Sequence, residues 1–278
     1  KHEDALREFR TAVQIQSQVL QKKPSDTAIA SNLADSASWI GTILQELGRL
    51  SESQSAFMEA INIIKPYHLS GKDTEASRLY AIIVLYQSEV AIRRGDVSSA
   101  KKLIDEAKGI FRELSLHDPS NSTWKNSLLS SDTYLLSLVA RHDWTSTERD
   151  IQAHAGAEFS SLIKADPSNL PFQINFLEIR RLGILDLLTQ GNVQAAQEAA
   201  ERAWSEWQEA IKGRTQTAEA LYAETRFQET IGTVFAANGE HEKAAAHWQE
   251  SVQKLEASQN PDPAFLAIRR LLALNLGQ

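Results

Sequence analysis

The chain has 278 residues, a formal net charge of −7, 42% hydrophobic residues and no cysteine. This composition excludes a disordered chain, a disulfide framework, thiolate metal sites and cysteine nucleophiles. The net negative charge argues against a broad nucleic-acid-binding surface. No apolar stretch approaches the ~18 residues of a transmembrane helix. The length suits either two ordinary domains or one long array.

The predicted elements recur along the chain with a period of about 48 residues. A first helix covers 2–22, and four glycines then each separate two apolar helical runs. Successive glycines lie 47, 96 and 48 residues apart, and Asp143 occupies the empty slot inside the longest interval. The four glycines are Gly48, Gly95, Gly191 and Gly239.

Prolines mark a second phase, half a period away from the glycines. Pro24 and Pro167 lie 24 residues before Gly48 and Gly191, and Pro119 lies 24 residues before Asp143. Pro263 lies 96 residues, or two periods, after Pro167. The segments between breakers are about 20 residues long and carry apolar residues at three- and four-residue steps, so they predict helices about 30 Å long. We expect the glycines to be left-handed C-caps and the polar residues beside the prolines to be N-caps. The expected N-caps are Ser25, Ser120, Ser168 and Asp262.

The residues around the glycines resemble the tetratricopeptide repeat (TPR) family. In the first unit, Gly41 lies seven residues before the turn at Gly48, and Phe57 and Ala60 follow the turn by nine and twelve. Small residues of this kind let two helices approach closely, and the aromatic residue fills the space beside them. The last unit repeats the pattern with Gly232, Gly239, Trp248 and Ser251. Units of about 48 residues, rather than about 34, are similar to a long-unit bacterial variety of the family.

The resemblance implies an all-α fold, a right-handed α–α superhelix that forms a TPR-like solenoid of about 12 antiparallel helices. It implies a single solenoid domain over 1–278, and we expect this to be a fragment of a longer chain, because the first unit lacks its helix A. The apolar last helix is expected to contact another chain or domain. The expected layout is a half unit 1–23, units 24–70, 71–118, 119–166, 167–214 and 215–262, and a capping helix 263–278.

The sequence contains no pattern of catalytic or metal-ligating residues. The seven histidines are scattered over different units, and no His-Glu-x-x-His, P-loop or Gly-x-Gly-x-x-Gly motif occurs. Acidic and basic pairs fall on predicted helix surfaces, where solvated charge is the commoner interpretation. We therefore expect no enzyme activity, no cofactor, no metal ion, and neither a nucleic-acid nor a membrane partner.

The tryptophans are better explained by core packing than by a ligand cage. Trp248 holds the aromatic position of the repeat, and Trp204 and Trp207 share one face of a predicted helix. The repeat pattern does not assign Trp39 or Trp144 to either the core or the surface. Trp144 lies at the degenerate turn and is a candidate for exposure.

In the TPR family, ligands bind a concave groove lined by the A helices. Mapped onto this repeat, the groove positions are polar and of mixed sign, without the Lys/Asn cluster that clamps a C-terminal carboxylate in TPR cochaperones. A polar peptide or a protein surface of complementary charge is the expected ligand. The candidate groove residues are Asp35, Ser38, Thr42, Gln45, Glu46, Glu89, Arg93, Ser130, Thr133, Ser137, Arg141, Glu178, Arg181, Arg226, Glu229 and Thr233.

The leading functional hypothesis is a non-catalytic scaffold for protein–protein interaction. The first alternative is a regulatory or sensor arm of a larger bacterial signalling protein, such as a kinase, a STAND-type ATPase or a transcription regulator. Two further alternatives are a peptide or small-ligand receptor and an enzyme with a convergent site in the superhelix hollow. The absence of a signal peptide in this sequence favours a cytoplasmic location.

Overall fold

The computed structural model describes residues 2–69, 71, 73–140, 144–215, 217–257 and 275. Throughout these ranges the regular elements are α-helices. The helices are α1 (His2–Lys22), α2 (Thr27–Glu46), α3 (Leu50–Leu69), α4 (Thr74–Arg93), α5 (Val97–His117), α6 (Ser122–Val139), α7 (Ser146–Ala165), α8 (Leu170–Thr189), α9 (Val193–Ile211), α10 (Ala218–Ala237) and α11 (His241–Ala257). The predicted capping helix 263–278 lies outside the described residues.

The expected glycine turns are confirmed. Gly48 and Gly95 have φ of 74° and 75°, in the left-handed region that a side chain disfavours. Gly191 and Gly239 take the same conformation. After Gly48, the N–H of Arg49 donates to the carbonyl of Leu44 at 2.8 Å, which satisfies a helix-end acceptor and reverses the chain into α3.

The expected N-caps are wrong by one residue in the units that the structure describes. Asp26 caps α2 by accepting from the N–H of Ile29, and Asn169 caps α8 by accepting from the N–H of Phe172. Ser168 donates instead to the carboxylate of Asp166, which forms the preceding turn. Because the serine side chain is bonded to Asp166 within this turn, the next residue, Asn169, caps the helix. Asp262 lies outside the described ranges.

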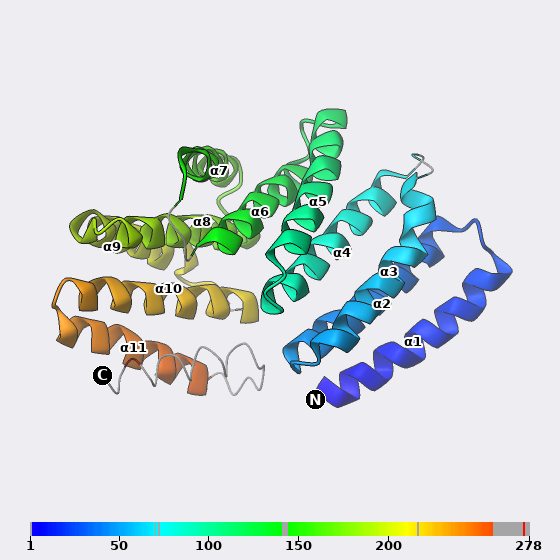
Figure 1. The fold of residues 1–278 in the computed structure, drawn as a ribbon, viewed down its shortest axis with the longest axis horizontal. Helices are drawn as coiled ribbons and strands as arrows, with labels where there is room; N and C mark the ends of the chain where they lie inside the picture. Colours follow the sequence, from blue (N-terminus) through cyan, green and yellow to red (C-terminus); the bar gives the residue numbers. More distant parts are fainter. Residues whose placement is uncertain are drawn as a thin grey trace. The chain divides into compact units, whose positions relative to one another are not determined.

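The chain divides between Leu138 and Val139 into two compact units. In the first unit, consecutive helices from α1 to α5 pack antiparallel against each other, and α2 also contacts α4 (Figure 1). The A helices α2 and α4 therefore stack directly, as neighbouring repeats must if they are to share a core. Phe57, Ile64, Ile104 and Phe111 are fully buried in this unit.

The second unit, which begins at Val139, repeats this arrangement with α7 to α11. Each of these helices contacts the next, and the A helices α8 and α10 are also in contact. The predicted core tryptophans Trp207 and Trp248 are buried, and Trp204 is half-buried against the same cluster. Trp144 is only 4% exposed, so its expected exposure is wrong.

The small residues on the A helices lie where aromatic side chains approach most closely. A methyl group added at Gly41 would lie 2.8 Å from the ring of Phe57, and one added at Gly232 would lie 2.1 Å from the indole nitrogen of Trp248. Both distances are shorter than a van der Waals contact. The repeat pattern of a small residue facing an aromatic residue is therefore a packing requirement.

We expect Gly232→Ala to destabilise the second unit by about 2 kcal/mol, because Trp248 must move and its indole N–H donates to the carbonyl of Glu229 at 3.2 Å. Urea unfolding followed by circular dichroism measures this change. Gly109→Ala is the matched control: Gly109 lies inside α5 with no atom within 4 Å of an added methyl group. There alanine should stabilise by up to about 1 kcal/mol. Equal effects at the two sites would contradict the packing requirement.

Candidate functional site

The candidate groove residues lie on the A helices of both units. In the first unit they lie on α2, α4 and α6, and in the second on α8 and α10 (Figure 1). Arg141 lies outside the described residues. Each unit therefore carries a candidate surface of its own.

Several of the candidate hydroxyl groups are engaged within their own helices. Ser38 donates to the carbonyl of Asp35 at 2.8 Å, and Ser137 donates to the carbonyl of Thr133 at 2.8 Å. Thr42, Ser130 and Thr133 also donate to backbone carbonyls four residues earlier. Ser38 and Thr133 are also buried. The side chains that remain available to contact a ligand on this face are therefore the longer charged and aromatic ones.

A polar cluster joins α2 to α4 in the first unit. Arg93 donates to the backbone carbonyl of Gln45 at 3.3 Å and to Oε1 of Glu89 at 3.1 Å. Glu46 forms an ion pair with Nδ1 of His2 at 3.3 Å. The structure thus brings Gln45, Glu89 and Arg93 together across two repeats.

Asp35 lies on the exposed side of α2, near Arg78 of α4. Burial raises the pKa of the Asp35 carboxyl above its usual value, although a hydrogen bond from Trp39 and the charge of Arg78 oppose this change. Arg78 is itself engaged, because its Nε donates to Oε2 of Glu75 at 2.8 Å. The negative charge of Asp35 is therefore only partly compensated.

The second unit holds a carboxylate between two arginines. Glu178 receives two hydrogen bonds of 2.8 Å from Arg181 in the same helix, α8, and Arg226 of α10 lies 3.4 Å from Oε1 of Glu178. Burial alone would raise the pKa of Glu178, but the two arginines outweigh it and lower the pKa to about 2. Arg181 is only 7% exposed. This triad joins α8 to α10 and presents Arg226 at its outer edge.

Glu229 and Thr233 form the remaining candidate pair on α10. The Thr233 hydroxyl donates to the backbone carbonyl of Glu229 at 3.0 Å and lies 3.2 Å from its Oε1. The Glu229 carbonyl also accepts from Trp248, so this pair is tied to the core of its unit.

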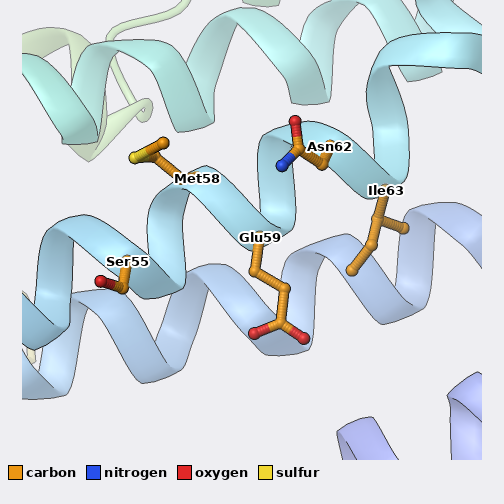
Figure 2. A pocket seen from close by; sticks show the side chains of 5 residues that line it. All are labelled: Ser55, Met58, Glu59, Asn62 and Ile63. Carbon is orange, nitrogen blue, oxygen red and sulfur yellow. The ribbon is translucent and has the colours of Figure 1, made fainter.

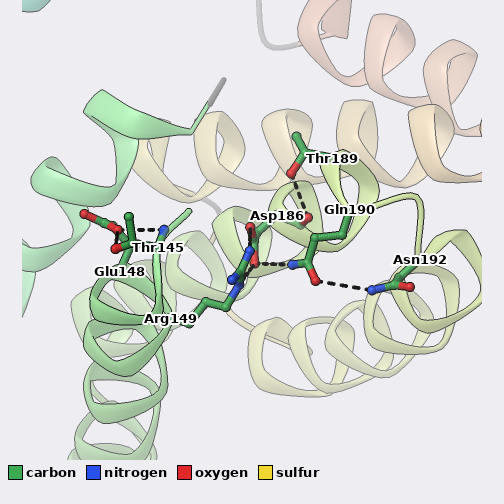
Figure 3. Close-up of polar contacts among 7 residues, drawn as sticks. All are labelled: Thr145, Glu148, Arg149, Asp186, Thr189, Gln190 and Asn192. Carbon is green, nitrogen blue, oxygen red and sulfur yellow. Dashed lines mark hydrogen bonds and ion pairs between the residues drawn. The ribbon is translucent and has the colours of Figure 1, made fainter. Parts of the chain in front are cut away.

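A further polar cluster in the second unit fixes α7 to α8 (Figure 3). Asp186 is 5% exposed and accepts from Nε and Nη2 of Arg149 at 2.8 and 3.1 Å. Gln190 also donates to Asp186, at 2.6 Å. The acceptor is nearly buried, and its partners are Arg149 of α7 and Gln190, the C-cap residue of α8, so the cluster serves packing.

An open hollow of about 450 Å³ lies on the B helix α3 (Figure 2). Its lining consists of Ser55, Met58, Glu59, Asn62 and Ile63, all from that one helix. No second element supplies a converging polar group to this lining. The hollow therefore offers less to a ligand than the A-helix faces.

The A helices of the first unit carry an aromatic row that was not predicted from the sequence. Trp39 of α2 and Tyr86 of α4 lie 47 residues apart, and Tyr134 of α6 follows 48 residues later. These separations match the glycine spacing, so the three residues occupy the same repeat position. Aligning the A helices by this spacing would have revealed the row from the sequence.

Two features bear on metal and membrane binding in the part of the chain that the structure describes: the grouping of metal-ligating side chains and the length and apolarity of the helices. No group of three or more His, Asp or Glu side chains there is arranged to hold a metal ion. None of the helices in that part is sufficiently long and apolar to cross a bilayer.

Comparison with solved structures shows the fold. BtubC (BKLC) from P. vanneervenii superposes with a TM-score of 0.63 at 15% identity, covering 95% of each chain. TTC0263, a thermophilic TPR protein in Thermus thermophilus, superposes with a TM-score of 0.50 at 14% identity, covering 88% of this chain and 100% of that one. No protein-family model and no curated protein sequence matches the chain. The predicted all-α, TPR-like solenoid fold is confirmed.

Proposed function

We propose that the chain is a non-catalytic scaffold that binds a peptide or a protein surface on its A-helix faces. The observation that carries this proposal is the direct stacking of A helices, α2 on α4 and α8 on α10. Polar contacts cross both junctions, from Arg93 to Gln45 and from Arg226 to Glu178. Each unit therefore presents charged groups that come from different repeats and are held in fixed relative positions.

The charges on these faces favour a macromolecular ligand of complementary charge. Both faces carry acidic and basic groups, so a partner with a complementary arrangement of charges would be attracted and oriented. Fixed side chains lose little conformational entropy when a ligand binds.

The proposal of one continuous domain over 1–278 stays a prediction.

Site-specific photo-crosslinking tests the proposal. We expect a photoreactive amino acid at Thr42 or Glu89, on the A helices, to capture a discrete protein or peptide partner from cells. The same group at Glu59 or Lys101, which are exposed on the B helices α3 and α5, should capture little. Mass spectrometry of the adducts identifies the partner and the attachment site. Capture mainly from the B helices would contradict the proposed surface.

A further inference from the structure

Two members of the aromatic row on the A helices of the first unit, Trp39 and Tyr86, are exposed, whereas Tyr134 is partly buried against the core. Trp39 is 48% exposed and Tyr86 is 39% exposed, whereas Phe57, at the aromatic repeat position of the B helix α3, is fully buried. A large aromatic side chain that stays in contact with water at two successive repeats is an uncompensated cost for an isolated chain. Exposed tryptophan and tyrosine residues are typical of the residues that dominate binding energy at interfaces.

Both exposed rings are braced from the B helices. The ring of Trp39 stacks on Phe9 of α1, with centroids 6.1 Å apart and an interplanar angle of 16°. Tyr86 contacts Phe57 of α3, with centroids 6.3 Å apart. Phe9 and Phe57 are 48 residues apart and so are repeat equivalents as well. Each repeat thus supports its outer ring in the same way, which reduces the entropy lost on binding.

The charges around the two rings leave an acidic excess. Asp35, Glu75 and Glu89 are acidic, whereas Arg78 and Arg93 are basic, which leaves one negative charge. Both arginines are engaged by glutamates, Arg78 by Glu75 and Arg93 by Glu89. Burial of the hydroxyl raises the pKa of Tyr86 most, the negative charges of Asp35 and Glu89 raise it further, and the charge of Arg78 lowers it, so these three charged groups lie near the Tyr86 side chain. A cation from a partner would complete the charge balance.

We propose that Trp39, Tyr86 and Asp35 bind an extended peptide segment that carries two bulky apolar side chains and an adjacent lysine or arginine. The apolar side chains pack on the two rings, and the cation lies between the face of Trp39 and the carboxylate of Asp35. A cation over an indole ring and beside a carboxylate is favoured by both contacts. This inference rests on the proposed function, for which it names the class of ligand.

The repeat geometry sets the spacing of the peptide side chains. Packed helices lie about 8–10 Å apart, so rings at equivalent positions on α2 and α4 recur at about that interval. A peptide in the extended polyproline II conformation has three residues per turn and advances about 3.1 Å per residue, so its residues i and i+3 lie on one face about 9 Å apart and match the two rings.

Selection from a random peptide library tests the inference directly. The immobilised 278-residue chain is used to select from a phage library of random 12-residue peptides, and Kd values of selected peptides are measured by fluorescence anisotropy. We expect enriched peptides to be basic and to carry bulky apolar residues three positions apart. Trp39→Ala and Tyr86→Ala should each raise Kd at least about tenfold. Asp35→Asn should remove the preference for a lysine-containing peptide over its lysine-to-methionine variant.

The controls separate binding from folding. Met58→Ala and Leu116→Ala remove side chains that are 50% and 74% exposed on the B helices, and Kd should not change. Trp39→Leu keeps apolar bulk against Phe9, so it should retain the fold by circular dichroism and still bind more weakly. Enrichment of acidic peptides, no enrichment, or unchanged binding in the Trp39 and Tyr86 variants would overturn the inference. If photo-crosslinks still map to α2 and α4 in that case, the scaffold proposal stands, whereas crosslinks on α3 and α5 would overturn that proposal as well.

Discussion

Replacing Phe57 with alanine is expected to destabilise the chain by about 4 kcal/mol. Phe57 is fully buried, its ring lies against Gly41, and it also contacts Tyr86. Its removal takes a large apolar surface out of the core and leaves a cavity between helices that meet at a glycine. Urea unfolding followed by circular dichroism gives the change in the apparent free energy of unfolding.

The adjacent residue provides the control for this experiment. Met58 lies on the same helix, α3, but is 50% exposed at the open hollow (Figure 2). We expect Met58→Ala to change the free energy of unfolding by no more than about 0.5 kcal/mol. A Phe57→Ala effect below about 1 kcal/mol would show that this side chain does not hold the repeats together.

The stability of the second unit is expected to fall below pH 4.5, as Glu178 becomes protonated. The folded pKa of Glu178 is about 2, against an ordinary value of 4.5, because Arg181 and Arg226 outweigh the effect of burial. A lowered folded pKa contributes stability above the unfolded pKa, and this contribution is lost as the pH falls toward 2. The difference between the folded and the ordinary pKa corresponds to about 3 kcal/mol of folding stability. The Glu178 side chain is only 15% exposed, so solvent screens this contribution little.

The variant Glu178→Gln tests this pH dependence. We expect it to lose about 3 kcal/mol at pH 7 and to show a weaker loss of stability between pH 4.5 and 2 than the unmodified chain. Glu206→Gln is the matched control, because Glu206 pairs with Arg180 at 2.5 Å but its side chain is 50% exposed. Exposed pairs contribute about 0–1 kcal/mol, so this control should be near neutral. A parallel loss in both variants would exclude a special role for the triad.

The candidate site was only partly accessible from the sequence. The repeat placed Gln45, Glu89 and Arg93 on neighbouring A helices, and the structure brings them into contact. Ser38 and Thr133 were assigned to the same face but are buried and bonded to their own helices. Repeat position fixes the side of the helix on which a residue lies, whereas its exposure depends on how closely the next helix packs.

The sequence by itself determined the helices, the turns and the positions of the small and aromatic residues. These features follow from local rules: breaker residues end helices, left-handed turns need glycine, and a small residue must oppose an aromatic one. Only the tertiary structure decided which charges are paired, that Trp144 is buried, and that Trp39 and Tyr86 stay exposed beside Asp35. Those outcomes depend on distances between side chains that are far apart in the chain, and a periodic pattern does not encode such distances.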